Sequence, residues 1–342
     1  MGSIHIHSYY SDGHATIPEI AKIAYNTGLD FLLFNDHMTL DPLRDGMQRW
    51  YDSVLAIIGY EINDDSNRNH YLVYGLKKIL PDNLSVYEYV KSAHDSGAVG
   101  FIAHPDEKRS SLPAHPPYPW VAWDAEGFDG IEIWNHSSEW LESLTPLNKY
   151  FRIWHPLKYL EGPGEEILAR WDELNRTRVV AGIGGTDAHA YPYKIGPLTV
   201  RIFRYKVLFK GIRTHVLLDE ELTGDVERSV AVILQALKNA RCFISHHRWG
   251  DARGFRFYAL TGNTRWLMGD TVTAEQVQFT VESPASGHIS LLRDGQVVAT
   301  SNGTALSYVT EASGAYRVEI KRKQNKSWIF SNHIRFQRTT KG

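Results

Sequence analysis

The segment Ser3-Ile4-His5-Ile6-His7-Ser8 carries the most informative pattern in this chain. Its apolar residues predict a β-strand over residues 3–8, and residues two apart in a strand point to the same side. Both imidazoles are therefore expected together, with Ile4 and Ile6 packed on the opposite side. A carboxylate follows in the turn Ser11-Asp12-Gly13, near the end of that strand. Imidazoles and a carboxylate at one strand end indicate a metal site.

Similar residues stand at the ends of other expected strands. We expect these strands over residues 31–37, 55–63, 71–76, 99–104, 130–135 and 179–187. The residues of metal-ligand type at or beside their ends are His37, Glu61, His70, His104, Asp187 and His189. His70 differs from the others because it stands at the start of its run. A single histidine at a strand end is more often a structural group. Nine residues of metal-ligand type at or near strand ends are not expected by chance.

The spacing of strands and helices predicts the fold of residues 1–250. Helices are expected over residues 17–27, 86–96 and 226–240, and the first two end at Gly28 and Gly97, as C-caps do. Seven strands with intervening helices predict a closed or nearly closed α/β barrel. Barrel enzymes gather their chemistry at the carboxyl ends of the strands, where these candidate ligands stand.

Residues 251–342 have a different sequence pattern, without the helix-like stretches of residues 1–250. Short alternating runs are expected as strands over residues 255–260, 277–282, 289–293, 297–301, 316–321 and 328–336, and Asp294-Gly295 is a hairpin signal. We expect a small β-sandwich of immunoglobulin-like type. It is interpreted as a structural or oligomerisation module, with carbohydrate or surface binding as the alternative, and the oligomeric state is left open.

Composition limits the classes of protein. The 342 residues fit two domains, and 43% hydrophobic residues suffice for a core. A net charge of −2 provides no general attraction to nucleic acid or anionic membrane, so we expect neither as a partner. We see no membrane-length apolar run and no secretory signal, and expect a cytoplasmic protein. A single cysteine, Cys242, excludes disulfides and a cysteine-built zinc site.

At this point the sequence resembles the PHP superfamily, named for its polymerase and histidinol-phosphatase members. The matching motifs cover residues 3–190 and are His5-Ile6-His7, Ser11-Asp12-Gly13, Asp36-His37, Glu61, His104-Pro105 and Asp187-Ala188-His189 after a glycine pair. Later blocks and the tail are similar to the branch that contains carbamate-insecticide hydrolases; these blocks are Arg213-Thr214-His215 and Arg241-Cys242-Phe243. The resemblance implies a distorted (β/α)7 TIM-like barrel holding two or three divalent metal ions (zinc, manganese or iron).

The resemblance also implies a ligand set. His5, His7, Glu61 and Asp187 would hold one ion, and Glu61 would bridge to a second held by His70 and His104. Asp12, His37 and His189 would hold the third. Two departures stand out: Asn35 where many relatives have threonine, and Asp12 where some phosphatases have histidine.

Such a set supports hydrolysis by a metal-bridging hydroxide that attacks phosphorus or a carbonyl carbon. Glu61 and Asp187 are the expected catalytic carboxylates. Arg109 is expected either to grip a substrate phosphate or carboxylate or to be a solvated loop charge. His247 is the better candidate of the adjacent pair His246 and His247. Glu132 is expected to make a structural hydrogen bond inside the barrel.

The leading functional hypothesis is a phosphoesterase acting on a small organic phosphate. The alternative is hydrolysis of a carbamate, ester or amide of an aromatic small molecule, favoured by the resemblance of the C-terminal half and by the aromatic loop that contains Trp120 and Trp123. A third reading is a metal-binding PHP module without turnover, which the complete ligand set argues against.

Overall fold

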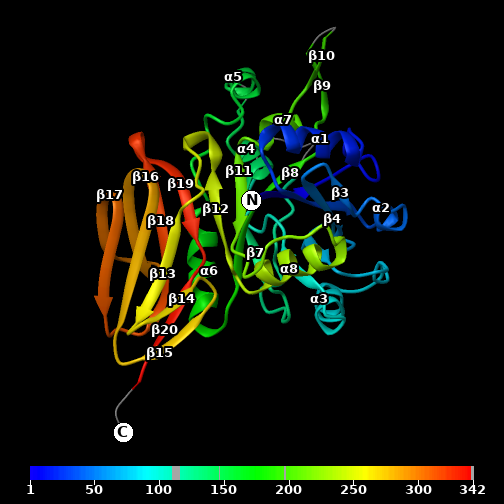
Figure 1. The fold of residues 1–342 in the computed structure, drawn as a ribbon. Coiled ribbons are helices and arrows are strands. Elements are labelled where there is room, and N and C mark those ends of the chain that lie inside the picture. The colour runs from blue at the N-terminus through cyan, green and yellow to red at the C-terminus, as the bar shows by residue number, and fades with distance from the viewer. Residues whose placement is uncertain (110–115, 146, 196–197, 340–342) are drawn as a thin grey trace.

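The computed structural model describes residues 1–342 except 110–115, 146, 196–197 and 340–342. Seven strands form a closed barrel (Figure 1). They are β1 (Gly2–Ile6), β2 (Phe31–His37), β4 (Val54–Ile62), β5 (Tyr71–Tyr74), β6 (Val99–Ile102), β7 (Gly130–Asn135) and β8 (Ala181–Ala188). Neighbours in this order pair with each other, and β8 closes the ring by pairing in parallel with β1. The predicted α/β barrel is confirmed.

The direction of β5 is the main irregularity of the barrel. β5 pairs antiparallel with both β4 and β6, whereas the other adjacent pairs are parallel. A short loop suffices to connect antiparallel strands, so β4 leads into β5 without a crossover helix. As a result, the start of β5 lies at the rim where its neighbours end. His70 therefore reaches the same rim although it precedes its strand.

Four longer helices accompany the barrel. They are α1 (Ile17–Thr27), α3 (Val86–Asp95), α6 (Glu165–Thr177) and α8 (Val226–Lys238). Capping boxes begin α1 (Thr16 with Glu19) and α3 (Ser85 with Glu88), and Gly28 ends α1 in the left-handed conformation. The shorter elements are α2 (Asp41–Arg44), β3 (Trp50–Tyr51), α4 (His136–Glu142), α5 (Lys149–Trp154) and α7 (Tyr205–Leu208). Among the described residues, no helix combines the length and apolarity needed to cross a membrane.

Two strands extend the barrel sheet toward the tail. β11 (Ile212–Val216) pairs with β1 and with β12 (Cys242–His246). A separate hairpin of β9 (Pro192–Ile195) and β10 (Leu198–Arg201) extends away from the barrel in Figure 1. The hairpin begins four residues after β8, which contains Asp187 and is followed by His189, so it begins beside the candidate site.

The tail is built of strands. They are β13 (Arg256–Thr261), β14 (Thr264–Leu267), β15 (Thr271–Ala274), β16 (Val277–Arg293), β17 (Gln296–Thr310), β18 (Gly314–Arg322), β19 (Lys326–Ser331) and β20 (Ile334–Arg338), with 3-10 turns at His247–Trp249 and Lys323–Asn325. The Asp294-Gly295 hairpin is present, and positive φ values of 50° and 84° fit a type I′ turn. β16 runs continuously where we expected two strands, because an irregularity between Glu282 and Gly287 absorbs the break.

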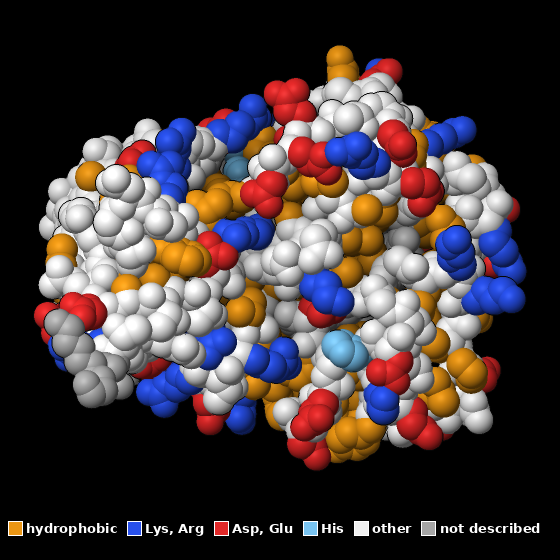
Figure 2. Space-filling view, turned by 60° about the horizontal axis from the view of Figure 1, so that its bottom comes forward, with side chains coloured by type: hydrophobic (Ala, Val, Ile, Leu, Met, Phe, Trp, Pro, Cys, Tyr) orange, Lys and Arg blue, Asp and Glu red, His pale blue; other side chains and the backbone are white. Residues whose placement is uncertain are grey.

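The tail has its own hydrophobic core, yet it is joined to the barrel by the sheet. β19 pairs antiparallel with β12, and Phe243 of β12 packs within the tail core. The side-chain amide of Asn332 donates to the carbonyls of Gly182 and Cys242, each at 2.9 Å. On the face drawn in Figure 2, acidic and basic side chains are interspersed over both parts. Through Phe243 and Asn332, the tail and the barrel share both apolar and polar buried contacts.

Candidate metal centre

The nine residues expected as ligands lie together at one rim of the barrel. β1, β2, β4, β6 and β8 deliver residues at or just beyond their carboxyl ends, and β5 delivers His70 from its amino end. Asp12 comes from the loop after β1. The members are His5, His7, Asp12, His37, Glu61, His70, His104, Asp187 and His189, each joined to another member by at least one contact of 3.8 Å or less.

Glu61 occupies the middle of this cluster. Its Oε2 lies 3.0 Å from Nε2 of His5 and 3.2 Å from Nε2 of His7. Its Oε1 lies 2.6 Å from Nδ1 of His70 and 3.3 Å from Nε2 of His104. Each carboxylate oxygen thus has a different pair of imidazoles nearest to it, and Nδ1 of His37 lies farther from Oε2, at 3.6 Å. This is the arrangement of a carboxylate able to bridge two cations.

Asp187 faces the first pair of imidazoles. Its Oδ1 lies 3.5 Å from Nε2 of His5 and 3.4 Å from Nε2 of His7. Ligand atoms of His5, His7 and Asp187 lie within 4.8 Å of one another, as do those of His5, Glu61 and His104. Both groups have the size and composition of a transition-metal site.

A third group forms at the more open side of the rim. Oδ1 of Asp12 lies 3.2 Å from Nε2 of His189, 3.8 Å from Nε2 of His37 and 3.6 Å from Nδ1 of His7. His7 consequently turns one ring nitrogen to Glu61 and the other to Asp12. The carboxylate of Asp12 is 43% exposed, whereas Glu61 is buried, so solvent reaches the cluster from the side of Asp12.

Unusual backbone conformations place three of these side chains. His5, His104 and Asp187 have positive φ values of 64°, 26° and 50°. Such conformations are strained for residues other than glycine and are concentrated at functional sites. The one at His5 coincides with a register shift in β1, so simple strand alternation does not hold there. The rings of His5 and His7 nevertheless lie 5.1 Å apart.

Glu132 of β7 orients two of the histidines. Its carboxylate oxygens lie 3.1 and 3.2 Å from Nδ1 of His5, and Oε2 accepts the backbone N–H of His104 at 2.8 Å. A Cβ at Gly185 would overlap this carboxylate, so a glycine is required there. Since Nδ1 of His5 is held by Glu132, Nε2 is left to face Glu61. The structural hydrogen bond expected for Glu132 is present.

Asp36 fixes the loop that carries Asp12. Its carboxylate accepts the backbone N–H and the hydroxyl of Ser8, each at 2.7 Å, and the hydroxyl of Ser11 at 2.7 Å. Tyr191 then holds Asp12 itself, because its hydroxyl donates to Oδ2 at 2.8 Å and its ring stacks on His189 at 4.7 Å. Tyr191 was missed by sequence reasoning; its place two residues after His189 was the available signal.

Electrostatics in the cluster reflect the packing of carboxylates against imidazoles. Burial acts to raise the pKa of Glu61, but the imidazoles around it, His5 foremost, hold that pKa well below its usual range. Burial acts to lower the pKa of His7, but Asp187 and Glu61 outweigh it and raise the pKa to about 9. Burial lowers the pKa of His37 to about 4. A cation entering the cluster therefore meets ionised carboxylates and displaces protons from imidazoles.

The donor atoms fit divalent metal ions. Both ring nitrogens of His7 and Nδ1 of His104 are buried and make no hydrogen bond among the described residues. The nitrogens of His7 face carboxylate oxygens at 3.2–3.6 Å without hydrogen-bond geometry. Buried polar atoms normally have partners, so such a set is expected around a bound cation. Imidazole and carboxylate suit zinc, iron or manganese.

Arg109 is engaged by its own loop. Its guanidinium forms an ion pair with Glu107, donates to the carbonyl of Pro116 and lies over the ring of Tyr118. Glu107 in turn lies 3.8 Å from Nδ1 of His104, and Tyr118 stacks on His70 at 5.2 Å. Arg109 is thus neither a solvated charge nor a free cation facing the cluster. It contacts Glu107 and Tyr118, which lie beside His104 and His70 respectively.

The structure does not bring His247 to the cluster. Its backbone N–H donates to the carbonyl of Gly211, and burial, followed by the charge of Arg213, lowers its pKa to about 4. No contact among the described residues joins it to a candidate ligand. The role expected for His247 stays a prediction; the strand that precedes it, β12, pairs with β11 and β19 outside the seven-strand ring.

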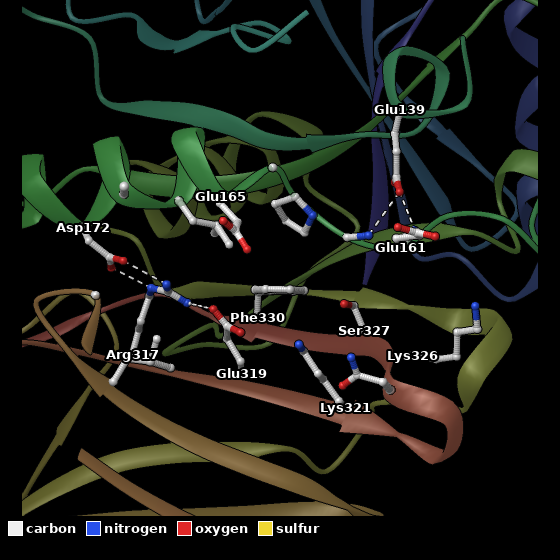
Figure 3. Close-up of a pocket in the computed structure, with 18 of the residues that line it drawn as sticks. Glu139, Glu161, Glu165, Asp172, Arg317, Glu319, Lys321, Lys326, Ser327 and Phe330 are labelled. Atoms are coloured by element: carbon white, nitrogen blue, oxygen red, sulfur yellow. Dashed lines mark hydrogen bonds and ion pairs between the residues drawn. The ribbon is translucent and has the colours of Figure 1, made fainter. Parts of the chain in front are cut away.

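A large cavity lies away from the cluster, between the barrel and the tail. It measures about 1270 Å³ and is drawn in Figure 3. Arg317 pairs there with Asp172 and Glu319, and Glu139 accepts backbone N–H groups of Glu161 and Gly162. A smaller cavity of about 120 Å³ beside His104 and Glu132 shares Glu139 with it. Of the side chains labelled in Figure 3, Asp172, Arg317 and Glu319 pair with one another across the contact between α6 and β18.

Comparisons with known proteins add the following. No protein-family model and no curated protein matches this chain. A two-domain protein from Bacteroides vulgatus ATCC 8482 containing a predicted PHP-like metal-dependent phosphoesterase is similar in structure, with 15% identity, a TM-score of 0.46, and 97% of this chain and 94% of that chain covered. A protein from Bifidobacterium adolescentis ATCC 15703, assigned by prediction as a metal-dependent phosphoesterase, has 15% identity, a TM-score of 0.35 and coverages of 60% and 93%. An amidohydrolase from Chromobacterium violaceum has 12% identity, a TM-score of 0.33 and coverages of 55% and 87%.

Proposed function

We propose that this chain is a metal-dependent hydrolase of the PHP type and that it acts as a phosphoesterase on a small organic phosphate. The observation that supports this most is the division of Glu61 between two pairs of imidazoles, one on each carboxylate oxygen. A carboxylate held between two cations needs further nitrogen ligands near each of its oxygens, and Glu61 has imidazoles near both of its oxygens.

In this proposal the residues keep the roles expected from the sequence. His5, His7, Glu61 and Asp187 hold one ion, Glu61, His70 and His104 a second, and Asp12, His37 and His189 a third. Divalent ions at such sites activate water as a nucleophile near neutral pH and stabilise the negative charge that develops on the attacked group. Glu132 and Asp36 hold His5 and the Asp12 loop in place. The open side at Asp12 and His37 admits the substrate.

Phosphoesters are favoured over aromatic carbamates or esters. The aromatic pocket considered from the sequence rested on tryptophans, but Trp120, Trp134 and Trp140 are buried in the barrel core. Trp134 lines only the small cavity of about 120 Å³ beside His104, and all three side chains present almost no surface to solvent. Hydrolysis of a carbamate, ester or amide would use the same metal chemistry. Activity assays with phosphate and acetate esters distinguish the two functions.

The test is metal content by elemental analysis on protein purified without chelators, combined with turnover of p-nitrophenyl phosphate, bis-p-nitrophenyl phosphate and p-nitrophenyl acetate. Wild type is compared with Asp187→Ala and with the exposed-carboxylate control Asp82→Ala. We expect two or three equivalents of metal, with phosphoester turnover lost in Asp187→Ala alone. Turnover of p-nitrophenyl acetate alone would indicate a carboxylic ester hydrolase instead of a phosphoesterase. Less than one equivalent, with no activity after Zn²⁺ or Mn²⁺ is added, would overturn the enzyme proposal.

A further inference from the structure

A further pocket, distinct from the two cavities described above, lies beside the metal-ligand rim and outside the cluster. It occupies about 610 Å³ between α1 and α7, and we call it the α1–α7 pocket. Part of its lining is apolar and comes from Ile23, Leu157 and Val207, with the rings of Tyr9 and Tyr205 beside them. Its volume and largely apolar lining are those of a small-molecule site.

Cations surround this apolar floor. Arg201, Arg204, Lys206 and Lys210 all line the α1–α7 pocket and are exposed. Among the described residues, none of the four forms an ion pair with a carboxylate. The one carboxylate in the lining, Glu19, accepts the backbone N–H and the hydroxyl of Thr16 at 2.8 Å each and keeps a negative charge that attracts Arg201, so the four cations exceed the anionic charge of the lining by three. In a chain whose net charge is −2, this is a local excess of positive charge.

The wall between the α1–α7 pocket and the metal centre is shared. The hydroxyl of Tyr205 donates to the carbonyl of His7 at 2.8 Å. The backbone N–H of His14 donates to the carbonyl of His189 at 2.9 Å, and Nδ1 of His14 is buried without a hydrogen-bond partner in the described chain. A molecule in this pocket would therefore contact Tyr205 and His14, which in turn hydrogen-bond to the backbone of two candidate ligands.

We infer that the α1–α7 pocket binds a small organic anion, a phosphate or carboxylate carried on an apolar body. The cations recognise the anionic group, and the apolar floor with Tyr9 and Tyr205 takes the body. The anion is either the second anionic group of a substrate or a separate effector. The first source rests on the proposed function, whereas the binding site itself does not.

The experiment measures binding of phenylphosphonate, which is not hydrolysed, to the metal-loaded full chain. Hydrogen–deuterium exchange locates the site, and calorimetry gives the Kd. We compare wild type with Arg204→Ala/Lys210→Ala and with Lys77→Ala/Lys78→Ala, a control that removes two exposed cations outside the pocket. We expect protection of residues 15–23 and 201–210 in wild type and the control. In the pocket variant this protection is lost and the Kd rises about tenfold, which corresponds to about 1.4 kcal/mol.

Other results of the same experiment would contradict the inference. Protection confined to the metal rim, or equal Kd and equal protection in wild type and the pocket variant, would overturn the inference. The source is then separated by kinetics: a raised KM for 4-carboxyphenyl phosphate but not for phenyl phosphate in the pocket variant supports a second substrate group. A change in p-nitrophenyl phosphate turnover by phenylphosphonate that the pocket variant lacks supports an effector. Absence of all turnover would sink the proposed function and leave the exchange result standing.

Discussion

The hydroxyl of Tyr191 donates a hydrogen bond to Oδ2 of Asp12 at 2.8 Å, while Oδ1 of Asp12 faces the imidazoles of the third candidate site. Oδ2 of Asp12 thus accepts a hydrogen bond that orients the carboxylate, and Oδ1 is left to face the imidazoles. Because Asp12 stands on a loop and is the most exposed carboxylate of the cluster, this bond fixes its direction.

From this relationship we predict that Tyr191→Phe weakens binding of the third metal equivalent about fivefold to tenfold, the effect of one lost hydrogen bond of about 1 kcal/mol. The ring still stacks on His189, so the first two equivalents bind as before. Stepwise Mn²⁺ titration followed by electron paramagnetic resonance measures this. Tyr193→Phe, on the same hairpin and without contact to Asp12, is the control. If Tyr191→Phe weakens the third equivalent equally in an Asp12→Ala background, Tyr191 does not act through Asp12.

Glu132 gives a second prediction. Glu132→Gln keeps the size of the side chain but removes the charge that orients His5, so metal affinity should fall about 10- to 100-fold. Far-ultraviolet circular dichroism should be unchanged, and the exposed variant Glu126→Gln should bind metal like wild type. Wild-type affinity in Glu132→Gln would show that the contact is only structural.

Gly185 provides a steric test of the same contact. The methyl group of Gly185→Ala would overlap the Glu132 carboxylate and approach Cβ of His5. We expect loss of the tightest metal equivalent or a lowered Tm. Gly224→Ala is the matched control because an added Cβ there meets open space. Unchanged metal binding and Tm in Gly185→Ala would contradict the packing described around Glu132.

The buried ion pair between barrel and tail gives a stability prediction. Asp172 of α6 accepts from Arg317 of β18 at 2.6 and 2.9 Å and lies 2.7 Å from Nε2 of His333. Asp172→Asn leaves the buried guanidinium with Glu319 as its charged partner, which should lower the free energy of unfolding by about 3 kcal/mol. Urea denaturation measures the loss, and the exposed variant Glu173→Gln should stay within about 0.5 kcal/mol of wild type.

The same pair has a defined pH dependence. Burial acts to raise the pKa of Asp172, but His333 and Arg317 outweigh it and hold the pKa at about 2, below the value of about 3.9 in an unfolded chain. A lowered carboxyl pKa stabilises the fold above pH 4, and this contribution, about 2 kcal/mol, is lost as the pH falls toward 2. The stability difference between wild type and Asp172→Asn should shrink from pH 5 to pH 2.5. A constant difference would contradict the assignment.

Removal of the tail is the last prediction. Ending the chain after Arg253 would expose the edge of β12 and the ring of Phe243, which pack against the tail. We expect the truncated protein to aggregate, as an uncovered sheet edge and apolar surface do. Size-exclusion chromatography distinguishes this from a soluble, monodisperse barrel, which would show that the tail is a separate unit.

Much of this fold and its rim was readable from the sequence because the signals are local. Alternation of apolar residues in strands, capping residues around Ile17 and Val86, and the Asp294-Gly295 turn depend on a few neighbouring residues. The candidate ligands stood at strand ends, and a barrel collects strand ends at one rim. The same reasoning placed Glu132 inside the barrel as a hydrogen-bonding group.

Tertiary structure alone decided the rest, because register and strand direction depend on residues far apart in the chain. The antiparallel course of β5 brings His70 to the rim, and the position of Glu61 between two imidazole pairs follows from four separate strands. His247 follows β12, which lies outside the ring, and Tyr191 reaches Asp12 across 179 positions of sequence. Local sequence specifies which chemical groups each strand end offers, whereas long-range pairing specifies which of them meet.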